Sequence, residues 1–563
     1  MLRKTTKFLS FFVTVVLIAS IMTGFASANA KLDANKELAV KLSDKYSGLI
    51  QEVGQTVWEF AEVGKFEYQS SNFLVEKLEQ LGFEVERGVG GFPTGFIGQY
   101  TYGTGGPVIG LLCEYDALPG LSSEVSGESG HGCGHNLYAA GAIGSAAVLK
   151  ELMDTKKIPG TIKVFGTPSE EIYASKMFYA KQGLLDGVDV FIGYHASSNN
   201  GVPFTENSAL SYKRYAFHGV ASHAGSSPEK GISALDAQEL MNIAVNFLRE
   251  HVPQDVRLHY IISKGGDAAN IVPAYAESYY YIRALSIETV AQVEKRVDDI
   301  AKAAAMATGC TAEIEFIDSC ANKILNRAGA ELAYKNTVLV GPPTFDQKDQ
   351  TAAKALGYEK GLSTVIEPLP DVPHKSGGSS DEGDVSWHAP LINFSMANYA
   401  SGTPGHSLDL TKQVNMPAAY KATTQTVKAV ACTAVDILTK PEELKKIQDE
   451  FAETMKDKEY PLGISKTPNP KEFKNAPGVV TTGSNKLTFT PNDTILLKEE
   501  AGTVVNVYLG DEKIGTTTLK DATSKYSITT TKDFKDGDIL VIKYQPKDAG
   551  NETLLGYISS FQQ

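Results

Sequence analysis

Cysteine is scarce in this sequence, with five among 563 residues. A fold held together by a network of disulfides needs many more, so we exclude that class of small stapled domain. Cys310 and Cys320 flank the strand-like segment TAEIEF. A strand rises ~3.3 Å per residue, which would hold their Cα atoms beyond disulfide reach, and we expect both thiols to be free.

Basic charge is in the minority, with 53 Lys and Arg against 66 Asp and Glu and a formal net charge of -13. The chain has no broad excess of positive charge that would attract the phosphates of a nucleic acid, so we expect no nucleic-acid partner. After residue 30 no run of ~18 apolar residues could span a membrane. The sequence also lacks a GxSxG motif and a convincing triad, which excludes a serine hydrolase.

Residues 1 to 30 have the pattern of a secretory signal peptide. Arg3, Lys4 and Lys7 precede the apolar run FLSFFVTVVLIASIMTGF, and the small residues Ala28 and Ala30 follow it. We expect cleavage near residue 31 and a secreted protein. An uncleaved membrane anchor is the alternative.

The chain is long enough for three or more packed units. Strand-like and helical segments alternate up to about residue 207 and again from 326, which predicts an α/β fold. Between them the order strand, helix, strand, strand, helix, strand predicts a self-contained α+β unit inserted in the chain. The predicted units are a signal peptide (1–30), a first α/β segment (31–207), the inserted α+β unit (208–325), a second α/β segment (326–440), a helix and linker (441–478) and an accessory domain (479–563).

Residues 479 to 563 alternate like strands, as in TVVNVYLGDEKIGTTTL, and contain no histidine or cysteine. We expect an all-β sandwich that acts as a spacer or attachment module. A contact with the cell wall or cell surface through this module is therefore a hypothesis.

The stretch HGCGHNLYAAG carries Cys133 and His135, two residues apart. Thiolate and imidazole both suit zinc or a similar ion, and on an extended segment the two side chains would project to the same side. A buried cysteine packed beside an ordinary histidine is the alternative.

Four further candidates follow predicted strands or lie in loops. Glu170 and Glu171 come after the strand-like GTIKVFG, where Ser169 could instead cap a helix whose first turn favours carboxylates. His195 ends the apolar segment VDVFIGYH, and His406 lies in GTPGHS. Because ligands bind beyond the carboxyl ends of strands in open α/β sheets, we expect these residues to meet in one site.

Seven blocks occur in order over roughly residues 35 to 440: CEYDALPGL, HGCGHNL, TPSEE, ASHAGSSPEKGISALDA, GDAANIVPAYAE, SSDEGDVSW and GTPGHS. This set resembles the amidohydrolase branch of the aminoacylase and carboxypeptidase metallopeptidase family. Within that branch it is most similar to the p-aminobenzoyl-glutamate hydrolases and related dipeptidases. The chain departs from this subgroup after the glutamate pair, where Ile172 and Tyr173 replace the usual glycines.

The resemblance implies that segments 31–207 and 326–440 form a three-layer catalytic domain and that the inserted unit 208–325 is its lid and dimerisation domain. It also implies two divalent metal ions, which could be Zn, Mn, Co or Ni, and a homodimer formed through the lid. Asp116 would orient a metal ligand, and Glu170 would be the general base. His223 would be a second catalytic residue that holds the oxyanion, and Asn270 would help to bind the substrate carbonyl oxygen or carboxylate, in such families often across the dimer. The implied metal ligands are Cys133, His135, Glu171, His195 and His406.

The function that follows is hydrolysis of the amide bond of N-acyl or N-aroyl amino acids by a metal-activated water. Arg283 could bind a substrate carboxylate through its planar guanidinium, although a solvated lid face is an equal alternative. A dipeptidase or carboxypeptidase would share the same metal ligands. A catalytically inactive metal-binding surface module is the alternative of another class.

Overall fold

The computed structural model describes residues 32–460, 468, 479–480, 485–489, 501–521, 524–534, 539–547 and 552–559. The predicted signal peptide lies outside the described residues. Most of the predicted linker that follows residue 460 also lies outside them.

The two predicted catalytic segments share one six-stranded sheet with the order β1-β2-β4-β3-β5-β12. The first two strands run antiparallel to their neighbours, whereas β4, β3, β5 and β12 are mutually parallel. The strands are β1 (Glu84–Arg87), β2 (Phe96–Tyr102), β3 (Val108–Cys113), β4 (Gly160–Gly166), β5 (Val190–Tyr194) and β12 (Leu391–Phe394). The carboxyl ends of four strands therefore meet at one edge.

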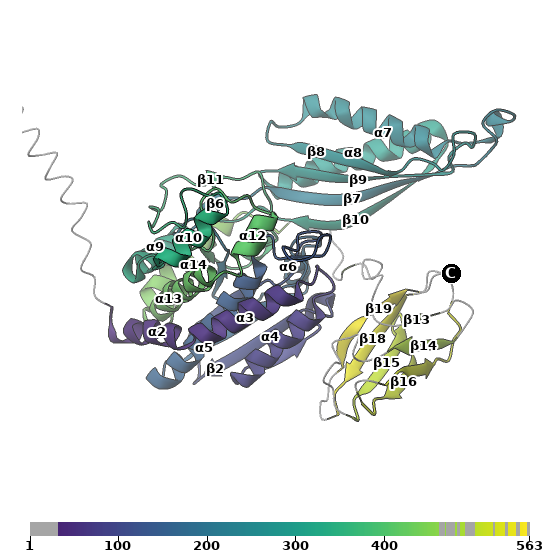
Figure 1. The fold of residues 1–563 in the computed structure, drawn as a ribbon. Coiled ribbons are helices and arrows are strands. Elements are labelled where there is room, and N and C mark those ends of the chain that lie inside the picture. The colour runs from purple at the N-terminus through teal and green to yellow at the C-terminus, as the bar shows by residue number, and fades with distance from the viewer. Residues whose placement is uncertain are drawn as a thin grey trace, which may run out of the picture.

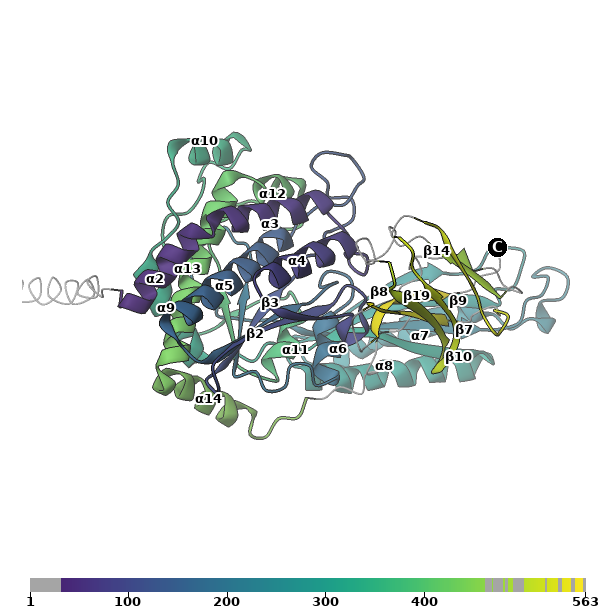
Figure 2. The same ribbon diagram turned by 90° about the horizontal axis from the view of Figure 1, so that it is seen from below.

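Both faces of this sheet are buried, as the almost uninterrupted apolar runs require. Ile109 and Leu111 of β3 pack into a core with the helices of one face, and Leu112 points into the core of the other face. The first face carries α2 (Ala34–Lys45), α3 (Ser47–Phe60), α4 (Tyr68–Gln80), α5 (His135–Lys156), α9 (Arg327–Val340) and α13 (Pro417–Thr439) (Figure 2). The second face carries α6 (Ser175–Lys181) and α11 (Glu382–Ser386).

The lid is a separate α+β layer that projects from the catalytic domain (Figure 1). Its antiparallel sheet has the order β10-β7-β9-β8, and two helices cover one face of it. The predicted order of elements is found as β7 (Ala209–His218), α7 (Ala234–Leu248), β8 (Arg257–Lys264), β9 (Tyr275–Ala284), α8 (Ile287–Thr308) and β10 (Thr311–Cys320). Strand β9 alternates strictly between buried and half-buried residues, so every second side chain packs against the helices.

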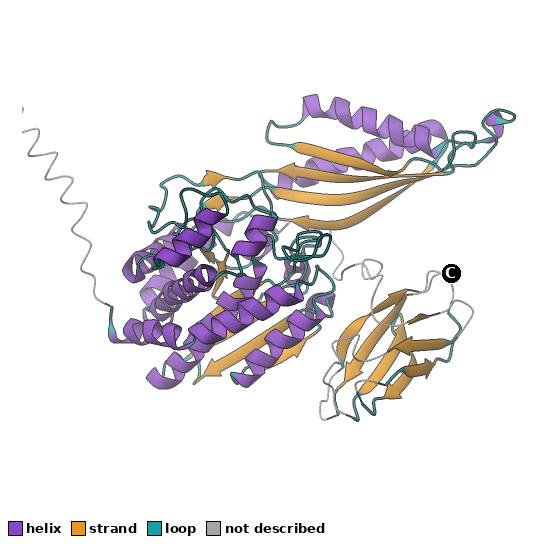
Figure 3. Cartoon of the chain, in the orientation of Figure 1, coloured by secondary structure: helices purple, strands orange, loops and turns teal. Residues whose placement is uncertain are grey.

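The C-terminal strands form two antiparallel sheets (Figure 3). One has the order β13-β14-β17 and the other β16-β15-β18-β19, and buried residues of both sheets share one apolar cluster. The strands are β13 (Val479–Val480), β14 (Lys486–Phe489), β15 (Val504–Leu509), β16 (Glu512–Thr518), β17 (Tyr526–Thr529), β18 (Ile539–Gln545) and β19 (Thr553–Ser559).

All five cysteines lie in the described portion of the chain, and none forms a disulfide there. The prediction for Cys310 and Cys320 is confirmed, since they lie at opposite ends of β10. Within the described residues, no helix combines the length and the apolar character needed to cross a membrane.

Candidate metal centre

The candidate residues meet at the edge where the parallel strands end. His195 follows β5 directly, and the Glu170-Glu171 pair follows β4 after a short turn. His135 is the first residue of α5, and His406 lies in the loop between β12 and α12 (Leu408–Gln413). The expectation that these distant residues share one site is met by the geometry.

Two groups of possible ligand atoms share the thiol of Cys133. The first is Cys133, His135 and His195, and the second is Cys133, Glu171 and His406. Within each group the atoms lie within 4.8 Å of one another, and Cys133 Sγ is 3.3 Å from His195 Nε2. Two ligands of one zinc ion, each ~2.0–2.3 Å away from it, stand up to ~4.6 Å apart. The arrangement therefore fits two divalent ions, and each group of residues would hold one of them.

The segment that carries Cys133 and His135 is not extended, contrary to our expectation. Gly134 adopts left-handed backbone angles, φ 92° and ψ 21°, and the helix starts at the next residue. A turn thus brings both side chains to the centre. His131 is buried and donates its Nε2–H to the Val57 carbonyl at 2.9 Å, which ties the turn to α3.

Asp116 fixes the orientation of His135. Its Oδ1 lies 2.8 Å from His135 Nδ1, and its Oδ2 accepts the backbone N–H of Glu171 at 2.9 Å. Burial would raise the pKa of Asp116, but the charge and hydrogen bond of His135 lower it below its usual value. An ionised Asp116 holds the Nδ1 proton of His135, so Nε2 is the ring atom that would ligate a metal ion.

Unpaired polar atoms support the presence of metal ions. Among the described residues, His135 Nε2 and Glu171 Oε1 are buried and have no hydrogen-bond partner, although His135 Nε2 lies 3.3 Å from the carboxylate of Glu114. Burial also raises the pKa of the Cys133 thiol to about 12. A bound divalent ion would satisfy all three groups, because it accepts the lone pairs and favours the thiolate.

Glu170 lies beside a second cluster of buried charges that the sequence analysis did not identify. Its carboxylate groups with those of Glu114 and Asp381, all within 4.8 Å. Lys176 Nζ lies 2.7 Å from Glu114 Oε1 and 2.6 Å from Asp381 Oδ1. Burial raises the pKa of Glu170 well above its usual value, and Glu114 and Asp381 raise it further. The blocks CEYDALPGL and SSDEGDVSW contain two of these residues, but their spacing gave no sign of the ion pair.

The comparisons with known proteins agree with this geometry. Residues 206–308 match the peptidase dimerisation domain of the M20 peptidases. The chain is 32% identical over 463 residues to one subunit of the p-aminobenzoyl-glutamate hydrolase of Escherichia coli, covering 75% of this chain and 96% of that protein. The chain belongs to the M20 peptidase family. The predicted resemblance is confirmed, and the protein is a peptidase or amidohydrolase.

Other M20 relatives differ in the activity that their names state. The Xaa-Arg dipeptidase of Mus musculus is 30% identical over 440 residues, which cover 76% of this chain and 94% of that protein. Among solved structures, the aminobenzoyl-glutamate utilization protein of Klebsiella pneumoniae has a TM-score of 0.51 at 17% identity, covering 70% of this chain and 97% of that chain. That similarity shows a shared fold.

In this M20 enzyme two cavities meet at the glutamate pair. The first, of about 320 Å³, contains Cys133, His195 and His406 together with Glu170 and Glu171. The second, of about 130 Å³, has the same two glutamates on one side and Arg283 of β9 on the other. Arg283 Nη1 donates to Ser379 Oγ at 3.0 Å, and its guanidinium lies 5.2 Å from the ring centre of Tyr281. Arg283 is therefore in the cleft beside the site.

Two other basic residues of the lid sheet, Lys213 and Arg214, lie away from the site. Lys213 is buried and paired with Glu294 and Asp298, and Arg214 pairs with three glutamates on the opposite face of the sheet. Both cations are therefore paired with carboxylates of the lid itself. They do not line either cavity.

His223 and Asn270 lie at the other end of the lid, in the loops that follow β7 and β8. The two loops are joined there, since the Ala224 N–H donates to the Asn270 carbonyl at 3.0 Å. Both residues are exposed, and neither lines a cavity that contains the metal-ligand candidates. Within one chain the structure does not bring them to the centre.

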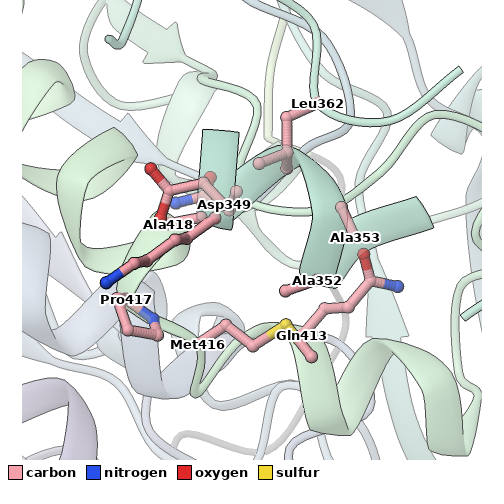
Figure 4. Close-up of a pocket in the computed structure, with 10 residues that line it drawn as sticks. Asp349, Ala352, Ala353, Leu362, Gln413, Met416, Pro417 and Ala418 are labelled. Carbon is pink, nitrogen blue, oxygen red and sulfur yellow. The ribbon is translucent and has the colours of Figure 1, made fainter. Parts of the chain in front are cut away.

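A third cavity, of about 200 Å³, is mostly apolar and lies apart from the metal centre (Figure 4). Asp349 and Ala353 of α10 (Gln347–Ala355) line one side, and Met416 and Pro417 at the start of α13 line the other. None of the candidate metal ligands belongs to its wall.

Proposed function

We propose that this chain is an exported, metal-dependent amidohydrolase that cleaves the amide bond of N-acyl or N-aroyl amino acids, such as p-aminobenzoyl-glutamate. The observation that carries the proposal is the pair of ligand groups sharing Cys133, with Glu170 beside them. The substrate class is supported by the name of the Escherichia coli relative.

The candidate ligands would hold two divalent ions, drawn from Zn, Mn, Co or Ni. Such ions lower the pKa of a bound water and polarise an amide carbonyl. Glu170 takes the proton of the attacking water and returns it to the departing amine, as a general base and then acid. The identity of the ion is open, because the set combines sulfur, nitrogen and oxygen ligands.

Arg283 binds the substrate carboxylate in this proposal. Its guanidinium lies in the cavity next to the glutamate pair, and Tyr281 supplies an aromatic wall on which the planar group rests. The scissile amide then lies where the two cavities meet, beside Glu170 and Glu171.

A homodimer would complete the site. On α7 the residues Leu240, Ile243 and Phe247 form an exposed apolar stripe, with Phe247 71% exposed. The neighbouring strand β8 is an edge of the lid sheet and exposes Ile261 at 64%. Apolar side chains beside an open strand edge favour pairing with a second copy.

Such a dimer would give the tip of the lid a function. His223 and Asn270 would reach the partner's centre and donate hydrogen bonds to the carbonyl oxygen or carboxylate of the substrate. This assignment accounts for their exposure within one chain.

A metallodipeptidase is the second candidate, favoured by the 30% identity to the mouse Xaa-Arg dipeptidase. A carboxypeptidase would use the same centre. For the C-terminal sheets we propose a β-sandwich that contacts the cell wall or cell surface after export. An M20 enzyme retained by an uncleaved signal would have the same catalytic domain.

One panel of assays tests the proposed function. The purified chain is incubated with p-aminobenzoyl-glutamate, N-acyl amino acids and dipeptides, each with chelator or with added Mn, Zn, Co or Ni. We expect hydrolysis of the aroyl and acyl amino acids that chelation abolishes. Activity that survives complete removal of metal contradicts the proposed centre, and cleavage of dipeptides alone favours the second candidate.

A further inference from the structure

Ser169, the residue directly before the glutamate pair, has a left-handed backbone with φ 64°. Residues other than glycine rarely adopt left-handed backbone angles, and those that do are held there by surrounding contacts. Ser169 does not cap a helix, since α6 begins only at Ser175. Its backbone angles set the direction in which the chain enters Glu170 and Glu171.

Glu67 holds Ser169 in this conformation. Its carboxyl group is buried with no exposed surface, and Oε1 accepts the backbone N–H of Ser169 at 2.7 Å and the Ser169 hydroxyl at 3.3 Å. Oε2 accepts the hydroxyl of Thr94 at 3.0 Å, which fixes the carboxyl plane. A buried N–H that lost this acceptor would be left without a partner.

The loop between α3 and α4, which carries Glu67, lies directly against the glutamate segment. The backbone N–H of Lys65 donates to Ser169 Oγ at 2.6 Å. A Cβ on Gly64 would lie 2.7 Å from Ile172 Cγ1 and 3.0 Å from the Ser169 Cα. Because the two segments pack so closely, a shift of the loop that carries Glu67 would also shift the glutamate segment.

We propose that Glu67 is a positioning residue for the reaction, which acts by fixing the left-handed backbone of Ser169 and thereby the direction of Glu170 and Glu171. The inference rests on the proposed function only in assigning Glu170 as the base. The position of Glu171, a candidate metal ligand, depends on Glu67 in the same way.

Two substitutions at Glu67 distinguish the loss of its hydrogen-bond acceptor from a change in side-chain volume. Glu67→Gln retains an oxygen that can accept the Ser169 N–H, whereas Glu67→Met has a similar length and no such acceptor. We expect Glu67→Met to lower kcat about 100-fold with KM changed less than about threefold, because a small misplacement of a catalytic group has that effect. Glu67→Gln retains most of the activity.

A second change tests the route through Ser169. Glycine adopts the left-handed region without steric cost, so Ser169→Gly in the Glu67→Met protein should restore at least about 10-fold of the lost kcat. A purely structural role for Glu67 predicts no such recovery. Equal kcat values in the single and double variants would overturn the inference. So would full activity of Glu67→Met.

A Co²⁺ titration of the full chain, followed by visible absorption, gives a measurement independent of turnover. Glu67→Met should weaken Co²⁺ binding about 10-fold or more, and Ser169→Gly should restore it. If the wild type cleaves no amide, the proposed function fails and this titration still decides on Glu67. If Glu67→Met does not fold, two variants of Ser169 test the same left-handed backbone, which glycine adopts readily and valine does not. Equal Co²⁺ affinities of Ser169→Val and Ser169→Gly would overturn the inference.

Discussion

Cys133 Sγ lies 3.3 Å from His195 Nε2, and the two residues reach this contact from different elements, the turn before α5 and the end of β5. The same sulfur belongs to the group with Glu171 and His406. A single thiol therefore connects both halves of the candidate centre.

Replacement of Cys133 should empty both metal positions. Serine is a poor ligand for these ions, so we expect Cys133→Ser to bind far less than two ions per chain and to lose at least about 1,000-fold in kcat/KM. The ions are counted by elemental analysis after dialysis. Cys310→Ser, in the lid, is the control and should retain both ions. A Cys133→Ser protein that still binds two ions would contradict the shared sulfur.

The two neighbouring glutamates should respond differently to the loss of one charge. Glu170→Gln should lower kcat by about 100-fold to 10,000-fold with the metal content unchanged, since a general base contributes in that range. Glu171→Gln should reduce metal content as well as activity. Turnover and ion content are measured on the same samples. The reverse pattern would mean that the two roles are exchanged.

Lys176 should be required for stability. Its ammonium group is buried between Glu114 and Asp381, and Lys176→Met would remove the cation that both carboxylates share, with the His135 ring still 3.3 Å from Glu114. We expect the free energy of unfolding to fall by about 3–5 kcal/mol, measured by urea denaturation. Lys302→Met, at an exposed site, is the control. Adding Asp381→Asn should recover some of the loss, and no recovery would argue against charge as the cause.

Asp384 should make the protein less stable as the pH rises. Burial, reinforced by Asp381, raises its pKa from 3.8 to about 8, although the Tyr460 hydroxyl lowers it. The folded state thus retains a proton that the unfolded chain has already released. This contribution to stability is complete below about pH 4, declines as the pH rises towards about 8 and is then constant.

The Asp384→Asn variant isolates this effect, because asparagine does not titrate. Relative to wild type, its free energy of unfolding should increase between about pH 5 and about pH 8 and change little above that range. Urea unfolding at a series of pH values gives the difference. Asp371→Asn on the surface is the control, and parallel curves for wild type and Asp384→Asn would rule out the assigned cause.

The apolar stripe of α7 should be needed for dimerisation. Phe247→Asp places a charge on the proposed interface, and we expect it to shift the protein to monomers in analytical ultracentrifugation. Activity should fall at the same time, because His223 would no longer reach a partner. Met306→Asp, at another exposed apolar residue, should leave the mass unchanged. A monomeric wild type would remove the basis of this prediction.

Local patterns in the sequence are sufficient to predict the parallel strands and the lid. The apolar runs that end at Tyr194 and Gly166 predict buried strands, and the polar residues after them are expected at one edge. The order of the lid elements follows from the change from helical to alternating periodicity. These features depend on neighbours within about twenty residues.

Long-range contacts are not predictable in this way. The pair of Lys176 with Asp381 joins residues 205 positions apart, and no periodicity marks it. The prediction of an extended segment at Gly134 is wrong, because the left-handed turn there depends on the start of α5. The bond from Ser169 to Glu67 spans 102 positions, and no local pattern indicates it.

All five metal-ligand candidates lie on the catalytic body, and the inserted lid from Ala209 to Cys320 contributes none of them. In the proposed function the catalytic body would hold the ions, and the lid, which presents Arg283 to the cleft, would contact the substrate. A lid exchanged as a unit with that of a relative would bring different substrate contacts to an unaltered centre. Diversification within such a protein can proceed by replacing one contiguous insert of the gene.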